Sequence, residues 1–172
     1  MGGSVAYAEA ARRLGTCLAD RRVTLVYGGG GLGLMGALAD AVLAGGGQVI
    51  GVIPRALEAR ELAHPHIQDM RVVPDMHSRK ALMADLSDAV MALPGGFGTF
   101  DELLEVLTWA QLGFHSKPIG LANVGGYFDP LIRTLDHAVA EGFARDAARG
   151  LVEVDDDPAR LLDRLSRRLV RG

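Results

Sequence analysis

Several classes of protein are excluded by what this sequence of 172 residues has little of. A single cysteine, Cys17, rules out an internal disulfide framework and favours a reducing, cytoplasmic compartment. Membrane association is not expected, because no apolar run approaches the roughly 20 residues of a membrane-spanning helix. The first residues, Met1 to Tyr7, also lack the basic and apolar regions of a signal peptide. The formal net charge of −3 gives no reason to expect a nucleic-acid partner.

Familiar nucleophile and metal patterns are missing as well. No serine lies in a Gly-x-Ser-x-Gly elbow, so a serine hydrolase has no support. Cys17 falls in an apolar helical pattern, which is typical of a small core residue rather than a nucleophile. None of the histidines has the spacing of a zinc site, so no metal is predicted: His64, His66, His77, His115 and His137. The segment His64-Pro65-His66 is expected to be a solvent-exposed loop.

Glycine and apolar residues are plentiful, with 23 glycines and 49% hydrophobic residues. This composition predicts one domain over residues 1–172 with a full-sized core. Apolar runs predict strands at 24–27, 48–53, 70–73, 89–93, 119–122 and 151–154, and the first four of these end at glycine or proline. Amphipathic spacing predicts helices at 7–20, 34–44, 76–87, 100–112, 127–141 and 158–170. The alternation predicts an α/β fold with a single, Rossmann-like, doubly wound and mostly parallel sheet.

A glycine loop follows the first predicted strand, where ligands bind in sheets of this kind. The segment from Gly28 to Gly36 contains Gly-x-Gly-x-x-Gly twice. Such a loop brings backbone N–H groups close to a phosphate, or it simply makes a tight turn, and both interpretations stay open. The absence of Gly-Lys-Ser/Thr excludes a triphosphate-binding P-loop. The next strand ends at Pro54-Arg55 without the acidic residue that would bind the ribose of NAD, which disfavours a dinucleotide cofactor.

Two cations, Arg79 and Lys80, fall near the start of the helix predicted at 76–87, with Ser78 or Asp75 as its N-cap. The helix macrodipole disfavours positive charge there by about 0.3–1 kcal/mol each. A solvated surface pair would explain them, but a nearby anion or substrate oxygen would also explain them.

The segment from Pro94 to Glu102 leads from a strand into a helix and offers more backbone N–H groups to a phosphate. Thr99-x-x-Glu102 reads as a capping box, in which the two side chains satisfy backbone N–H groups of the first turn. Glu102, with Asp101 and Glu105 beside it, would equally suit a site where positive charge develops on a sugar during hydrolysis. Local sequence does not decide between capping and catalysis.

These motifs in combination resemble those of the LOG (Lonely Guy) family of cytokinin riboside 5′-monophosphate phosphoribohydrolases. The matching segments extend over nearly the whole chain: 27–30, 33–36, 51–54, 75–80, 94–102 and 108–111. The resemblance implies hydrolysis of the N-glycosidic bond of an adenosine 5′-monophosphate, with or without an N6 substituent. The products would be the free base, a cytokinin or adenine, and ribose 5-phosphate. No cofactor is implied, a homodimer is expected, and the lysine-decarboxylase label often given to such proteins finds no pyridoxal-phosphate site here.

Site residues follow from the resemblance position by position. Arg79 and Glu102 look like the catalytic pair. The expected substrate contacts are Glu61, Lys80, Gly95, Gly96, Phe97, Gly98, Thr99, Asp101 and Thr108. The expected phosphate-loop residues are Gly29, Gly30 and Met35.

The N-terminus departs from the family pattern. Members usually begin with a hydrophobic strand ending in Cys-Gly-Ser-Ser, whereas only Met1 to Val5 precede the first predicted helix. We therefore expect the first strand of the sheet to be missing or truncated, which would remove donors to the phosphate. An alternative function, a non-catalytic nucleotide-binding or sensing module on the same fold, stays open for this reason.

Overall fold

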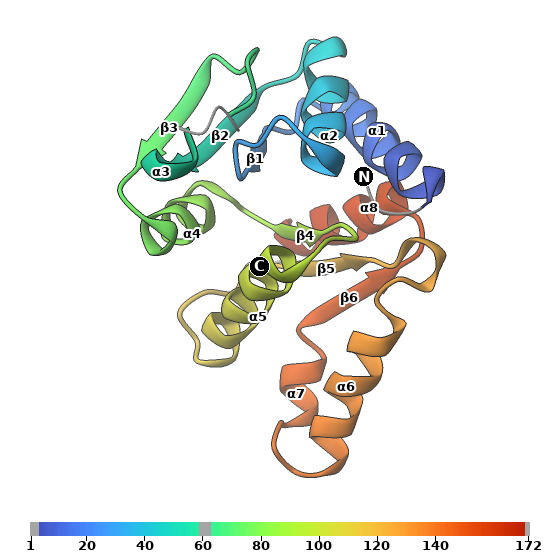
Figure 1. Cartoon of the computed structure of the whole chain (residues 1–172). Helices are drawn as coiled ribbons and strands as arrows, with labels where there is room; N and C mark the ends of the chain where they lie inside the picture. The colour runs from blue at the N-terminus through green and yellow to red at the C-terminus, as the bar shows by residue number, and fades with distance from the viewer. Residues whose placement is uncertain (1–3, 59–62, 171–172) are drawn as a thin grey trace. The chain divides into compact units, whose positions relative to one another are not determined.

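The computed structural model describes residues 4–58 and 63–170, which form two compact units that divide between Ser87 and Asp88 (Figure 1). The elements of the first unit are α1 (Val5–Asp20), β1 (Leu25–Tyr27), α2 (Gly33–Ala44), β2 (Val49–Pro54), α3 (Arg55–Glu58), β3 (Asp69–Val73) and α4 (Met76–Leu86). The elements of the second are β4 (Val90–Ala92), α5 (Phe97–Gln111), β5 (Ile119–Ala122), the 3-10 turn η1 (Val124–Gly126), α6 (Asp129–Ala140), α7 (Asp146–Arg149), β6 (Val152–Asp155) and α8 (Pro158–Leu169).

The first unit is built on a parallel sheet with the order β1-β2-β3. Leu25 pairs with Val49 and Tyr27 with Gly51, so the glycine loop begins at the carboxyl edge of β1. Helices α1 and α2 pack along each other through small residues (Figure 1). A Cβ atom on Gly15 of α1 would lie 2.6 Å from Cβ of Ala41 on α2, so the two helix backbones approach closely.

The second unit repeats this plan with the order β4-β5-β6, also parallel. Strand β5 is buried along its whole length and α8 packs against β5 and β6. Leu161 of α8 is fully buried, and its methyl carbons would lie 3.0 Å from a Cβ atom on Gly120. A second cluster, including Leu103, Ile119 and Phe128, forms the core between this sheet and α5.

The predicted α/β class is confirmed, since parallel strands alternate with helices in both units. The described strands form two three-stranded sheets, one with β1 and β3 at its edges and the other with β4 and β6 at its edges. Helix α5 begins three residues before its predicted start. Two four-residue helices, α3 and α7, were not predicted, because a single turn shows no periodicity. The predicted single domain stays a prediction, and Met1 to Gly3 lie outside the described residues.

No helix in the part of the chain that the structure describes combines the length and the apolar character that a bilayer span requires.

Leu161→Ala tests the packing of the second unit. Removing a fully buried leucine leaves a cavity and costs about 2–5 kcal/mol of unfolding free energy. Leu169→Ala is the matched control, since it is the same substitution on the same helix at a residue 45% exposed. Urea denaturation measures both variants. Equal losses of unfolding free energy in the two variants would contradict the burial of Leu161 in the core.

Candidate functional site

The glycine loop of the first unit takes a shape that requires glycine at particular positions. Gly29 and Gly33 have φ angles of +73° and +67°, in the left-handed region that side-chain-bearing residues avoid. At Gly36 a Cβ atom would overlap the carbonyl group of Gly31, so the loop folds back onto the first turn of α2. The N-cap of α2 is Leu32, whose apolar side chain offers no capping acceptor. The first N–H groups of α2, at the turn that carries Met35, therefore suit an anion.

A second segment, Ala63 to His66, lies against this loop. The N–H of His64 donates to the carbonyl of Gly29 at 2.8 Å, and Ala63 forms an antiparallel bridge with Gly30. The His64 ring is buried, with Nε2 3.1 Å from Asp40 Oδ1 and Nδ1 accepting from the N–H of His66 at 3.3 Å. Because Nδ1 accepts, Nε2 carries the hydrogen and donates to Asp40.

The prediction of a solvent-exposed loop is therefore wrong for His64, although Pro65 and His66 are exposed. The contact with Asp40 spans 24 residues of sequence, so no local pattern indicated it. Tyr27, at the end of β1, lies in the same region. Burial, and to a lesser degree the Asp40 carboxylate, raise the pKa of its hydroxyl well above the ordinary value.

Arg79 comes from α4, whose N-cap is Asp75, one of the two predicted caps. Asp75 Oδ1 accepts a hydrogen bond from the N–H of Ser78 at 2.8 Å. Arg79 lies one turn into the helix and is only 9% exposed, with Nη1 3.8 Å from Met76 Sδ. A solvated surface position is therefore wrong for Arg79, and Lys80 is half-buried. The Arg79 guanidinium packs on the backbone of Gly28, so the first unit brings Arg79 to the glycine loop.

In the second unit, the Pro94-to-Glu102 segment joins β4 to α5. The carbonyl of Gly95 accepts a hydrogen bond from the hydroxyl of Tyr127. On its other side Gly95 meets Thr99, because a Cβ atom there would overlap Thr99 Oγ1. Two contacts thus fix the backbone of the loop immediately before the helix.

The start of α5 corrects one prediction. Gly96 is the N-cap and Phe97 is the first helical residue, so Thr99 is the third residue of the helix and Glu102 the sixth. A capping box needs its serine or threonine at the N-cap, so the assignment to Thr99 and Glu102 is wrong. Space is open around Gly96 and Gly98, and Phe97 is 94% exposed. Backbone N–H groups at this end of α5 can therefore be approached by a ligand.

Other predicted substrate contacts lie further along α5. Asp101 is exposed and Glu102 is half-buried. Thr108 is exposed, and its hydroxyl donates to the carbonyl of Leu104 at 2.7 Å. Each compact unit thus carries one group of predicted residues, Arg79 in the first and Glu102 in the second. Glu61 lies outside the described residues.

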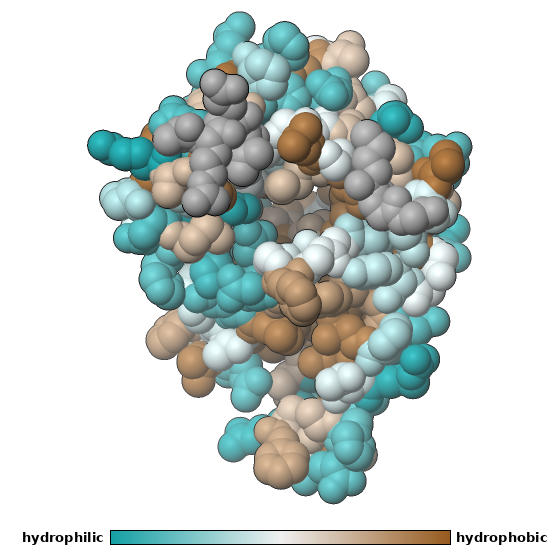
Figure 2. Space-filling view, viewed as in Figure 1, coloured by the Kyte–Doolittle hydropathy of each residue, from teal (hydrophilic) through white to brown (hydrophobic). Residues whose placement is uncertain are grey.

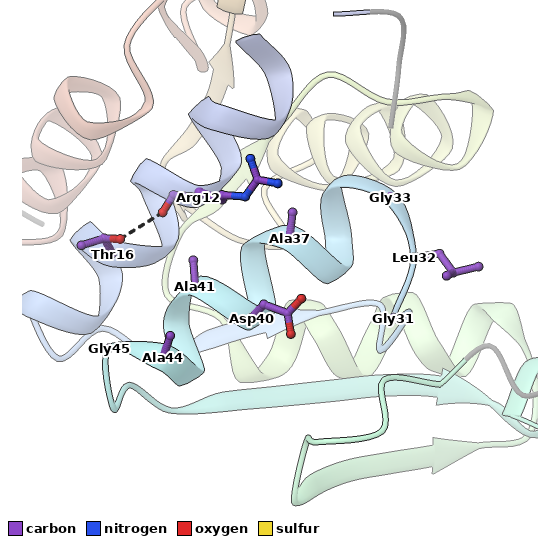
Figure 3. Close-up of a pocket in the computed structure, with 10 residues that line it drawn as sticks. All are labelled: Arg12, Thr16, Gly31, Leu32, Gly33, Ala37, Asp40, Ala41, Ala44 and Gly45. Carbon is purple, nitrogen blue, oxygen red and sulfur yellow. Dashed lines mark hydrogen bonds between the residues drawn. The ribbon is translucent and has the colours of Figure 1, made fainter. Parts of the chain in front are cut away.

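A groove of about 650 Å³ lies between α1, α2 and the glycine loop (Figure 3). Figure 3 shows Arg12 extending from α1 toward α2. Asp40 lines it from the side of α2, while Gly31 and Gly33 line its loop end. Arg79 is not part of its lining, so the groove is separate from the predicted catalytic arginine. Among the residues described, His, Cys, Asp and Glu side chains form no cluster of three that could hold a metal ion.

Comparison with known proteins adds sequence relatives. The model of a family described as "Possible lysine decarboxylase" matches residues 35–165. The chain is 52% identical over 159 residues to the probable cytokinin riboside 5′-monophosphate phosphoribohydrolase LOGL2 of Oryza sativa subsp. japonica, covering 92% of this chain and 65% of that protein. It is 54% identical over 151 residues to the cytokinin riboside 5′-monophosphate phosphoribohydrolase LOG1 of Arabidopsis thaliana, covering 88% and 71%. The chain spans about two thirds of the length of these relatives.

Solved structures show the same fold. The molybdenum cofactor binding protein of Rippkaea orientalis matches with a TM-score of 0.74 at 19% identity, covering 98% of this chain and 91% of that one. The molybdenum cofactor carrier protein of Chlamydomonas reinhardtii matches with a TM-score of 0.70 at 23% identity and the same coverage.

Asp75→Asn tests the cap of the helix that carries Arg79. Hydrogen bonds from Ser78 hold the pKa of Asp75 below its ordinary value. A lowered pKa stabilises the folded state above the ordinary pKa of about 4, and this stabilisation is lost as the pH falls through the lowered value. Asparagine also caps well but does not titrate. We expect the variant to lose less stability than wild type between about pH 5 and pH 2 in thermal melts. If the melting temperatures of the two proteins fell in parallel with pH, a stabilising role for the charge of Asp75 would be contradicted.

Proposed function

The chain belongs to the LOG family of cytokinin riboside 5′-monophosphate phosphoribohydrolases, and on this premise we propose that it hydrolyses adenosine 5′-monophosphates, including N6-substituted ones. The observation that carries the proposal is the identity of about half of all residues, over about nine tenths of the chain, with relatives that bear this name. The two loops described above support it, since each offers backbone N–H groups beside a predicted catalytic side chain.

The reaction breaks the C1′–N9 bond of the nucleotide. Water forms the new bond to C1′, and its second proton ends on the released base, so the products are the base and ribose 5-phosphate. Positive charge develops on the ribose in the transition state, and a carboxylate stabilises it while orienting the water. Glu102 takes this role. Arg79 holds a substrate oxygen, and loop N–H groups at Gly96 and Gly98 bind the phosphate.

This chemistry needs residues from both compact units. We therefore propose that residues 1–172 act as one nucleotide-binding domain, with Arg79 and Glu102 as its catalytic residues. Lys80 and Thr99 belong with them as substrate contacts, as do Glu61, Gly95, Phe97, Asp101 and Thr108, and Gly29, Gly30 and Met35 contact the phosphate. Cytoplasmic localisation stays a prediction from the sequence.

Glu102→Gln tests the catalytic assignment. Wild type should release free base from AMP or from isopentenyladenosine monophosphate. The variant should be slower by about 10²–10⁴-fold, because a neutral amide neither stabilises the positive charge on the ribose nor accepts a proton from the water. Chromatography of the products measures the rate. Glu9→Gln, the same change at an exposed residue of α1, is the control.

Two outcomes would contradict the proposal. Release of base at the wild-type rate by Glu102→Gln would remove the carboxylate from the mechanism. Binding of AMP by calorimetry without any product from wild type would favour the nucleotide-sensing alternative. Incubation with lysine serves as a further control, and cadaverine should not form.

We further propose that the protein is a homodimer that associates through α5. Hydrophobic side chains gather over this helix on the face in Figure 2, although the helix carries only one fully buried residue, Leu103. Leu104, Leu112 and Phe114 are 43%, 61% and 75% exposed. A second copy would remove this apolar surface from water.

Leu104→Glu tests the dimer. A carboxylate in the middle of an apolar interface would have to be desolvated, so the variant should dissociate at least tenfold more readily than wild type. Light scattering after gel filtration, over a dilution series, measures the masses. Leu169→Glu, on α8 and 45% exposed, is the control. A monomeric wild type, or a dimer unaffected by Leu104→Glu, would overturn the proposed interface.

A further inference from the structure

Gly28 differs from the glycines that follow it, because backbone conformation does not explain it. Gly29 has a φ angle of +73°, whereas Gly28 is not among the residues with positive φ. Any residue could therefore adopt the backbone of Gly28. Gly28 is also buried and follows Tyr27 at the end of β1.

The space beside Gly28 is filled by one side chain. The three atoms nearest to a Cβ placed on Gly28 all belong to Arg79: the atom would overlap Nη2, lie 2.8 Å from Cζ and lie 3.3 Å from Nε. Real Cβ atoms essentially never come within 3.0 Å of another heavy atom. The guanidinium therefore occupies the volume that any other residue at position 28 would need.

Because Arg79 is buried, a side chain added at position 28 would displace a charged group that lies out of water. The Arg79 side chain is 9% exposed, and its helix packs against β1 and β2. A charged group out of water is held by its surroundings, so a displaced guanidinium would lose its fixed geometry. The end of a long side chain can nevertheless move aside, so an added methyl group should shift the guanidinium rather than unfold the chain.

We infer that Gly28 is a positioning residue for the reaction, and that it leaves the space in which the Arg79 guanidinium is held at the glycine loop. This inference rests on the proposed function, in which Arg79 contacts the nucleotide. The first glycine of the loop then acts through Arg79 and not through a phosphate contact of its own.

Gly28→Ala tests the inference. We expect kcat for AMP hydrolysis to fall about 10²-fold, because displacing a catalytic group by about 1 Å costs that much. The melting temperature should change little. Gly150→Ala, where an added Cβ would meet its nearest atom at an ordinary 3.5 Å, is the matched control and should keep wild-type kcat.

A double-mutant cycle separates positioning from a general structural effect. In the Arg79→Ala background, Gly28→Ala should cause no further loss of kcat, because no guanidinium is left to displace. Losses that add, or wild-type kcat in Gly28→Ala, would overturn the inference. If Gly28→Ala alone fails to fold, the double variant should fold, since removing the Arg79 side chain frees the space; failure of both would also overturn it.

Crystal structures of wild type and Gly28→Ala give a readout that does not depend on turnover. The guanidinium should move by about 1 Å or more in the variant. If wild type releases no base but the guanidinium moves, the proposed function fails and the steric inference stands. If wild type is active and the guanidinium stays in place, the inference about Gly28 fails alone.

Discussion

Three glycines between the end of a parallel strand and the first turn of the next helix leave no room for a Cβ atom, and the candidate site depends on this steric constraint. At Gly28 the space belongs to the Arg79 guanidinium, at Gly36 to the Gly31 carbonyl, and at Gly95 to the Thr99 side chain. The first contact holds a charged group, the second shapes a loop and the third fixes a loop to the start of a helix. Glycine is therefore required at these three positions for three different steric reasons. Phosphate binding is not needed to explain the presence of glycine at any of the three.

The helices that follow the strands begin in two ways. At α4 the carboxylate of Asp75 accepts from the N–H of Ser78, so this end already carries a negative charge. At α2 and α5 the N-caps are Leu32 and Gly96, neither of which has a side-chain acceptor. Backbone N–H groups at these two ends are therefore better suited to a phosphate than those at α4.

The sequence allowed the fold class and most elements to be predicted because they depend on local periodicity; Ile119–Ala122 agrees to the residue. Asp75 was one of two predicted caps, with Ser78 as the other, because the signal of a cap is local. The start of α5 was not, because threonine is a common N-cap and glycine a weaker one, so the pattern favoured Thr99 over Gly96. The burial of His64 and Arg79 arises from contacts with Asp40 and Gly28, which are distant in sequence. Neither hydrophobic periodicity nor a sequence motif indicates contacts between residues so far apart in the sequence.

The corrected start of α5 changes how Glu102 is interpreted. As the third residue after an N-cap at Thr99, the glutamate would have had a purely structural explanation. As the sixth residue of a helix that begins at Phe97, it lies beyond the turn that needs capping. Thr99, three residues earlier, projects from the same side of the helix and lies against Gly95. The carboxylate is thus on the side of α5 that meets the Pro94–Gly96 loop, and capping no longer explains the glutamate.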